Sequence, residues 1–402
     1  MSFDVRVLSG EDDLLAASAT FRTALIGLPP LPPGTDVTEF FEPGRTLGAF
    51  DGGRLVGTAD SYASTLTVPG GARAPHAAVT HVGVLPTHTR RGVVTALMRR
   101  QLADAAARGE VVATLRASEA VIYERFGYGI ASSSARREVS RRQAVPRPGV
   151  PRGGPVRLAD PAASWKLLAQ IYESATGRAG MIGRPASWWR QQEQRQAAAP
   201  GPAYVAVHGR DGREDGYVRY HPTGTEEWFT SRDRVIVVDD FVAATPEAYA
   251  GLVRYLLGLD LVDRIVLPST APDDPLPLLL TDDRAVRTVC VRDETWLRLV
   301  DVPAALSLRA YRGPGRVALA VTDDLLPGNT GTYLISEDGA ARTEGPADLT
   351  VDVATLGALY LGGSRWWQHA RAGRVAVHRD GALETAEALF HTDALPFSGT
   401  GF

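Results

Sequence analysis

A strand, a basic turn and a helix follow one another directly from Val79 onward, and this order constrains the fold more than any other stretch of the chain. Val79–Leu85 is rich in β-branched residues, and the turn after it carries Arg90, Arg91 and Gly92. From residue 93 the apolar residues recur with a spacing near 3.6, as in a helix that buries one face. Because the first amides of a helix lack partners and lie at the positive end of its dipole, the pattern predicts a phosphate site. A solvated helix cap would show the same pattern.

A second motif follows the next strand. Val111–Leu115 is again β-branched, and the segment beyond it contains Tyr123-Glu-Arg-Phe-Gly-Tyr128. Together the two motifs resemble the active site of the GNAT acetyltransferases. In that family acetyl-coenzyme A lies between two parallel strands that splay apart, and the tyrosine of a Tyr-x-x-Phe-Gly-Tyr segment acts as the general acid. The resemblance therefore implies that Tyr123 is catalytic.

The turn departs from the family pattern at two positions. That pattern is basic-x-x-Gly-x-Gly/Ala, which falls here on Thr89, Gly92 and Val94. Arg90 and Arg91 lie next to the missing basic position, and backbone amides bind phosphate whatever their side chains. We therefore expect the phosphate site to be retained with altered detail.

The resemblance also implies which residues contact acetyl-coenzyme A. The Val82 amide would polarise the thioester carbonyl, and the amide and carbonyl of Val84 would pair with the pantetheine arm like an added strand. The complete expected set is Val82, Gly83 and Val84 in the strand, Arg90, Arg91, Gly92, Val93, Val94 and Thr95 in the turn and helix start, and Ser118 and Glu119 beyond the second strand.

Length and composition indicate a globular protein of several domains. The chain has 402 residues, 44% of them hydrophobic, and a net charge of −3, which gives no reason to expect nucleic-acid binding. No apolar run reaches the roughly 18 residues that a membrane span needs, and no signal peptide is evident. A single cysteine, Cys290, excludes an intramolecular disulfide. We expect a cytoplasmic protein.

Proline and glycine mark a boundary between the first domain and the next. Residues 144–155 hold four prolines and three glycines, so the first domain is expected at 1–143. Beyond it the order of elements repeats, with strands at 234–242 and 264–267 and a helix at Pro246–Leu257 between them. Ala243-Ala-Thr-Pro246 replaces the basic turn. We therefore expect a second GNAT-like domain at 156–292 without a cofactor.

The two-copy layout and the tail resemble the Eis-like acetyltransferases of actinobacteria over nearly the whole chain. In that family a sterol-carrier-protein-like domain follows two GNAT folds, which implies an α/β (α+β) fold class with that third domain at 306–402. The pattern of the tail fits this independently, with strands expected at 317–321, 331–336 and 348–353 and helices at 353–361 and 383–390. Relatives assemble as hexamers, so the resemblance implies a homohexamer.

The resemblance assigns the general base to the end of the chain. In Eis-like proteins the α-carboxylate of a terminal phenylalanine is thought to deprotonate the amine, and this chain ends in Phe402. Burial would raise the pKa of that carboxylate from its usual value of about 3.5 and make it a better base. The eight histidines are scattered and no metal motif is present, so no metal is expected.

The amine acceptor is left open by the sequence. Some relatives acetylate aminoglycosides, and such polycations need acidic groups near the site. The stretch Phe21–Ala24 and the penultimate Gly401 offer none, whereas four other carboxylates could serve: Glu39, Glu42, Glu119 and Glu124. The leading interpretation is an N-acetyltransferase for a small polyamine-like acceptor. The alternatives are a protein-lysine acetyltransferase and a protein that binds coenzyme A or lipid without turnover.

Overall fold

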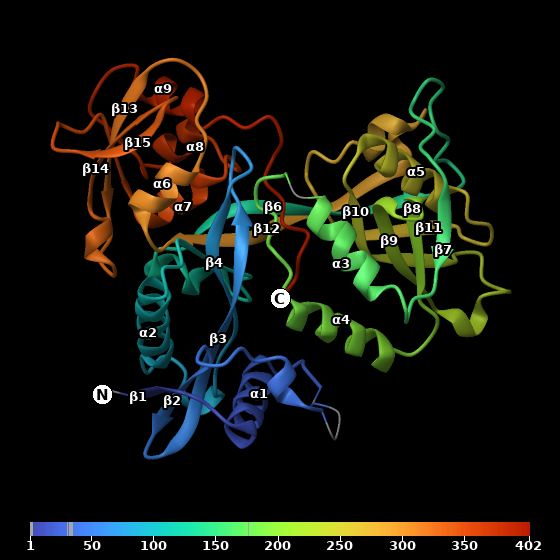
Figure 1. Cartoon of the computed structure of the whole chain (residues 1–402), viewed down its shortest axis with the longest axis horizontal. Coiled ribbons are helices and arrows are strands. Elements are labelled where there is room, and N and C mark those ends of the chain that lie inside the picture. The colour runs from blue at the N-terminus through green and yellow to red at the C-terminus, as the bar shows by residue number, and fades with distance from the viewer. Residues whose placement is uncertain (1–2, 30, 32–34, 176) are drawn as a thin grey trace. The chain divides into compact units, whose positions relative to one another are not determined.

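The computed structural model describes residues 3–29, 31, 35–175 and 177–402, and the chain divides into two compact units. The first unit comprises Met1–Ser132, Arg178–Arg190 and Glu294–Phe402, and the second comprises Ser133–Gly177 and Gln191–Asp293. The first unit thus joins the beginning of the chain to its end. In Figure 1 the blue N-terminal strands and the red C-terminal segment are the two ends of the chain that this unit combines.

A twisted sheet forms the N-terminal part of the first unit. Its strands follow in the order β1 (Asp4–Val7), β2 (Leu47–Asp51), β3 (Arg54–Thr67), β4 (Arg73–Val84), β5 (Val112–Leu115) and the end of β12 (Val286–Leu299). Only the pair β4 and β5 is parallel; the other pairs described are antiparallel. Two short 3₁₀ turns follow β5, η3 (Ala120–Ile122) and η4 (Glu124–Phe126), and others lie at η1 (Val37–Glu39) and η2 (Pro86–His88).

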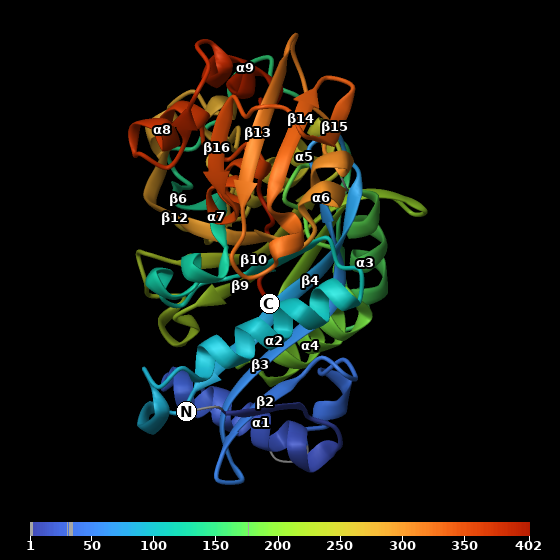
Figure 2. The ribbon, with the colours of Figure 1, turned by 90° about the vertical axis from the view of Figure 1, so that its left-hand side faces the viewer.

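Two helices cover opposite faces of this sheet. A Cβ at Gly57 would meet Val93 of α2 (Val93–Ala107), and a Cβ at Gly83 would meet Phe21 of α1 (Glu11–Leu25). Gly83 pairs with Thr58, the residue after Gly57, and successive side chains along a strand point to opposite faces. Figure 2 shows α2 in front of the strands and α1 behind them. The helix predicted from residue 93 is confirmed.

The C-terminal part of the first unit is a separate sheet with its own helices. The strand order is β15 (Gly339–Thr343), β14 (Gly331–Ser336), β13 (Arg316–Thr322), β16 (Leu349–Asp352) and β17 (Ala376–Val377). The helices are α6 (Val302–Leu308), α7 (Val353–Tyr360), α8 (Trp366–Arg371) and α9 (Ala382–Leu389), with η8 at Pro327–Asn329. The three predicted strands and two predicted helices are confirmed, whereas β15, β17, α6 and α8 were not predicted.

The second unit repeats the order of the first. Its sheet runs β6 (Gly129–Ser140), β11 (Arg264–Thr270), β10 (Val235–Ala243), β9 (Arg213–Thr223), β8 (Tyr204–Arg210) and β7 (Val156–Ala159). The helices are α3 (Trp165–Ser174), α4 (Ala186–Ala198) and α5 (Pro246–Leu257), with η5 (Thr225–Glu227), η6 (Leu276–Leu279) and η7 (Asp283–Ala285). The predicted order of strand, helix and strand is confirmed, because α5 connects β10 to β11; the two strands are parallel. β6, β12 and α4 contribute residues to both units.

None of the helices in the described ranges has the length and apolar character needed to cross a membrane.

Candidate active site

The parallel strands β4 and β5 pair over only a short length. His76–Ala78 pairs with Val112–Thr114, and β4 then continues to Val84 along β3 alone. Over its last six residues, β4 therefore has a backbone edge that is not paired with β5. An extended ligand can pair with such an edge as an added strand.

A β-bulge lies within this stretch of β4. Thr58 pairs with Gly83 and Asp60 pairs with Thr80, so His81 and Val82 together face the single residue Ala59. His81 has a φ of 49°, in the left-handed region that non-glycine residues rarely occupy. Its carbonyl accepts a hydrogen bond of 2.9 Å from the Thr58 hydroxyl. The bulge turns the backbone of β4 at the position where the family resemblance implies polarisation of the thioester carbonyl.

The direction of the β4 amides follows from one hydrogen bond. The Leu85 amide donates to the Val56 carbonyl of β3 at 2.9 Å. Because amides alternate in direction along a strand, those of Val84 and Val82 point away from β3, toward the unpaired edge. These are the two amides that the family resemblance assigns to acetyl-coenzyme A.

The start of α2 offers amides without a side-chain cap. Gly92 is the N-cap residue with a φ of 91°, and no side chain caps it. The first backbone hydrogen bond of the helix runs from the Ala96 amide to the Gly92 carbonyl. Within the described chain, the N–H groups of Val93, Val94 and Thr95 therefore have no hydrogen-bond acceptor. α5 differs, because its Thr245 hydroxyl accepts from the Ala248 amide at 3.0 Å. The α2 start therefore suits a pyrophosphate, and the α5 start is already capped.

The two arginines of the turn differ in their surroundings. Arg90 is exposed, with a φ of 61°, whereas Arg91 forms an ion pair of 3.0 Å with Asp51. The Val93 side chain is buried in the core, so only its backbone can serve a ligand. The expected cofactor residues of β4 and the helix start therefore lie along one connected stretch of backbone.

Tyr123 lies between η3 and η4 and is buried, 5% exposed. Burial and, to a lesser extent, the negative charge of Glu119 raise the pKa of Tyr123 to about 12. The hydroxyl therefore keeps its proton at neutral pH, which is the form a general acid needs. Ser118 and Glu119 are exposed beyond the end of β5. The Tyr128 ring meets the Tyr123 ring edge-on, 6.2 Å away between centroids.

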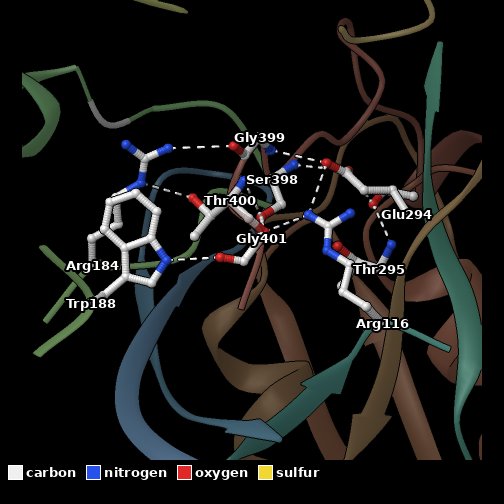
Figure 3. A network of polar contacts seen from close by, with 10 residues as sticks. Arg116, Arg184, Trp188, Glu294, Thr295, Ser398, Gly399, Thr400 and Gly401 are labelled. Carbon is white, nitrogen blue, oxygen red and sulfur yellow. Dashed lines mark hydrogen bonds and ion pairs between the residues drawn. The ribbon is translucent and has the colours of Figure 1, made fainter. Parts of the chain in front are cut away.

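The last residues of the chain are held by a buried carboxylate (Figure 3). Glu294 accepts hydrogen bonds from the amides of Ser398 and Gly399 at 3.0 and 2.9 Å and from the Ser132 hydroxyl at 2.8 Å. Its other contact is an ion pair of 3.2 Å with Arg116. The Glu294 side chain is completely buried, so these four donors replace water around its charge.

Further contacts hold the residues on the C-terminal side of that anchor. Arg116 donates to the Thr400 carbonyl, Arg184 donates to the Thr400 hydroxyl at 3.0 Å, and the Trp188 indole donates to the Gly401 carbonyl at 2.8 Å. Thr400 is fully buried. The end of this chain is therefore packed, although chain termini usually fray.

Phe402 follows this anchored segment and is half-buried. Its ring meets the Tyr62 ring of β3 edge-on, with centroids 5.7 Å apart. Within the described part of the chain its carboxylate forms no hydrogen bond or ion pair. The base predicted from the resemblance is thus on a fixed terminus beside β3. Glu294, Arg184 and Trp188, which contact residues 398–401 just before it, were not found from the sequence, because only tertiary folding brings them to the tail.

Arginines neutralise three of the four carboxylates considered for a polycationic acceptor. Glu39 lies 3.2 Å from Arg190, Glu42 lies 2.8 Å from Arg45, and Glu124 lies 2.7 Å from Arg374. The fourth, Glu119, is exposed, and no ion pair joins it to any described residue. The charge available to attract a polycation is therefore smaller than the sequence suggests.

Comparison with known families matches all three parts of the chain. A model described as an acetyltransferase (GNAT) domain matches residues 12–131, another with the same description matches 180–299, and a sterol carrier protein domain matches 302–399. With the sheets and helices described above, these matches confirm the expected fold class of two GNAT folds followed by a sterol-carrier-like domain.

Individual proteins are similar over most of their length. An uncharacterized N-acetyltransferase of Streptomyces griseus is 37% identical over 99% of each chain. The N-acetyltransferase Eis of Mycobacterium tuberculosis is 36% identical over 86% of this chain and 85% of its own. The crystal structure of Eis1 from Mycobacterium abscessus superposes with a TM-score of 0.93, at 52% identity and full coverage of both chains.

Proposed function

The chain belongs to the Eis-like family of GNAT N-acetyltransferases and is an acetyltransferase, and on that premise we propose that it acetylates an amine of a small molecule, with Tyr123 as general acid and Phe402 as general base. The observation that carries the proposal is the fixed C-terminus beside β3, in the same unit as the unpaired edge of β4. A carboxylate held in place in the same unit as a strand edge suited to acetyl-coenzyme A is a candidate base for an amine that attacks there.

Acetyl-coenzyme A supplies the acetyl group, and the chain holds it mainly by backbone. The Val84 amide pairs with the pantetheine arm, and the Val82 amide donates to the thioester oxygen on which negative charge develops. The amides of Val93, Val94 and Thr95 bind the pyrophosphate, helped by the α2 dipole. Ser118 and Glu119 lie along the other side of the arm. Gly83, Arg90, Arg91 and Gly92 complete the proposed set.

Two proton transfers accompany the acyl transfer. The amine nitrogen forms a bond to the acetyl carbon and gives its proton to the Phe402 carboxylate. The carbon–sulfur bond breaks, and Tyr123 gives its proton to the departing thiolate. The raised pKa of Tyr123 keeps that proton in place until negative charge reaches the sulfur. No step in this scheme uses a metal.

The acceptor we favour is a small polyamine-like molecule, with the more highly charged aminoglycosides as a less favoured possibility. The Arg190, Arg45 and Arg374 contacts occupy three of the acidic groups that a polycation would use. A protein-lysine acceptor remains the second candidate. A protein that only binds lipid is disfavoured, because aromatic side chains such as Trp366, Tyr360 and Phe390 fill the interior of the third domain.

The test measures release of coenzyme A from acetyl-coenzyme A by the wild type, Tyr123→Phe and a Phe402 deletion. The acceptor panel comprises monoamines, polyamines, aminoglycosides and lysine peptides. We expect turnover with the small amines and a fall of kcat of roughly a hundredfold in each variant. The KM for acetyl-coenzyme A should stay within about twofold of the wild type, because neither change touches the backbone donors. Full turnover by the Phe402 deletion contradicts the assignment of the base.

The assembly, location and domain limits belong to the same proposal. We propose a cytoplasmic homohexamer, with domains at 1–143, 156–292 and 306–402 and acetyl-coenzyme A bound by the first alone. The cap on α5 supports the absence of a second cofactor site. Native mass spectrometry with acetyl-coenzyme A measures the number of chains in the assembly and the number of acetyl-coenzyme A molecules bound to it. We expect six of each.

A further inference from the structure

Polar contacts anchor the four residues, 398–401, that come before the last residue of the chain. Glu294 is the centre of the anchor, because its buried carboxylate accepts from two consecutive backbone amides, those of Ser398 and Gly399. Gly399 has a φ of 65°, which other residues rarely adopt and which sets the direction of the chain just beyond these two amides. Hydrogen bonds to a charged acceptor are about twice as strong as neutral ones.

We propose that Glu294 is a positioning residue for the Phe402 carboxylate, acting through the backbone of the tail and through Arg116. The inference rests on the proposed function, in which Phe402 is the base. With Thr400 fixed, two further residues allow the terminal carboxylate to reach no more than about 7 Å from it. Trp188 restricts that range again, because it holds the Gly401 carbonyl.

Arg116 connects this anchor to the strand that borders the predicted cofactor site. It directly follows Leu115, the last residue of β5, and its guanidinium contacts both Glu294 and the Thr400 carbonyl. Ser118 and Glu119, which we assign to acetyl-coenzyme A, come two and three residues later. The position of the base is thereby tied to the end of the strand that borders the acetyl donor.

The first measurement is independent of activity. Glu294→Gln keeps the shape of the side chain but removes its charge, so the amides of Ser398 and Gly399 should exchange with solvent about tenfold faster or more, as a loss above 1.4 kcal/mol predicts. Hydrogen exchange of the full-length protein, followed in its C-terminal peptide, measures the exchange rates of these two amides. Glu337→Gln is the matched control, because Glu337 is exposed in the turn between β14 and β15. Exchange equal to that of the wild type overturns the proposal.

The second measurement shows whether Glu294 acts through Phe402. Glu294→Gln should lower kcat by roughly tenfold and leave the KM for acetyl-coenzyme A within about twofold. Combined with the Phe402 deletion, it should cost no more than the deletion alone, because both changes remove the same positioned group. Additive losses overturn the positioning role. If the Phe402 deletion alone is fully active, the proposed base is wrong, whatever the exchange rates show.

A milder variant guards against misfolding. Trp188→Phe removes the hydrogen bond to Gly401 but keeps an aromatic ring beside the Arg184 guanidinium, which lies 4.3 Å from the centroid of the Trp188 ring. It should lower kcat by a few fold. When it is combined with the Phe402 deletion, kcat should fall no further than in the deletion alone. Unchanged kcat in this variant, together with failure of Glu294→Gln to fold, makes Glu294 a structural residue only and overturns the proposal.

Discussion

The Thr58 hydroxyl donates to the His81 carbonyl at 2.9 Å, and this contact ties the β4 bulge to β3. Thr58 is buried and pairs with Gly83, two residues beyond His81. The bulge adds one residue to β4 and so shifts the alternation of amide directions along the strand. It therefore affects the side to which the Val82 and Val84 amides point. A polar residue on β3 thus helps to shape the proposed cofactor edge of β4.

Thr58→Val should weaken binding of acetyl-coenzyme A while preserving the shape of the side chain. Loss of one buried hydrogen bond costs about 1 kcal/mol, which corresponds to roughly a fivefold rise in Kd. Isothermal titration with acetyl-coenzyme A measures the change. Thr332→Val, in β14 of the third domain, is the matched control and should bind as the wild type does. An unchanged Kd in Thr58→Val would mean that the bulge holds without this bond.

Buried His76 makes the stability of the first domain sensitive to acid. Its Nε2 lies 2.7 Å from the Thr114 hydroxyl, and burial, with the positive charge of Arg45, lowers the pKa of His76 from 6.5 to about 3. The unfolded chain takes up a proton below pH 6.5 and the folded chain does not. The stability that His76 contributes is therefore complete above pH 6.5 and is lost as the pH falls toward 3.

His76→Gln should remove this dependence. Between pH 7 and pH 5 the wild type should lose about 2 kcal/mol from this group, and the variant should lose correspondingly less. Urea unfolding at the two pH values measures the difference. His378→Gln, at an exposed position, should behave as the wild type does. Equal acid sensitivity of wild type and His76→Gln would assign the effect to other groups.

Local pattern was enough to predict the elements that frame the site. The helices from Val93 and Pro246 begin where the sequence places them, because each has a clear start signal and apolar spacing that tertiary packing then uses. β15 was missed because Gly339–Thr343 is short and consists mostly of small residues, so no alternation of apolar and polar residues marks it. α8 begins with two tryptophans, Trp366 and Trp367, and is too short to show a period.

The contacts that hold the tail could not be predicted in this way. Glu294 and Gly399 are far apart in the sequence, and an isolated glutamate in a strand is most often solvated. The resemblance drew attention to Phe402 but not to the residues that hold it. A local sequence pattern does not show which residues far apart in the chain contact one another. Burial and hydrogen-bond geometry in the folded structure show this.

A second buried ion pair joins β12 to the third domain. Arg298 donates to both carboxylate oxygens of Asp323, at 2.8 and 2.6 Å, and Asn329 donates to the same carboxylate at 2.8 Å. Arg298→Met should lower the free energy of unfolding by about 3–5 kcal/mol, because it leaves the Asp323 charge buried without its cation. Arg298→Met combined with Asp323→Leu should recover part of the loss. Thermal unfolding compares the three proteins, and a double variant less stable than Arg298→Met would contradict the account.

The terminal carboxylate itself can be moved without deleting Phe402. Adding two residues after Phe402 converts its carboxylate to an amide, so kcat should fall by roughly a hundredfold while acetyl-coenzyme A binds as before. Phe402→Leu keeps the carboxylate and loses only the edge-on contact with the Tyr62 ring, an interaction of about 1 kcal/mol, so it should retain most of the activity. The same two residues added before Met1 should have no effect. An extended chain with normal kcat would show that the base lies elsewhere, and an inactive Phe402→Leu would assign the role to the ring.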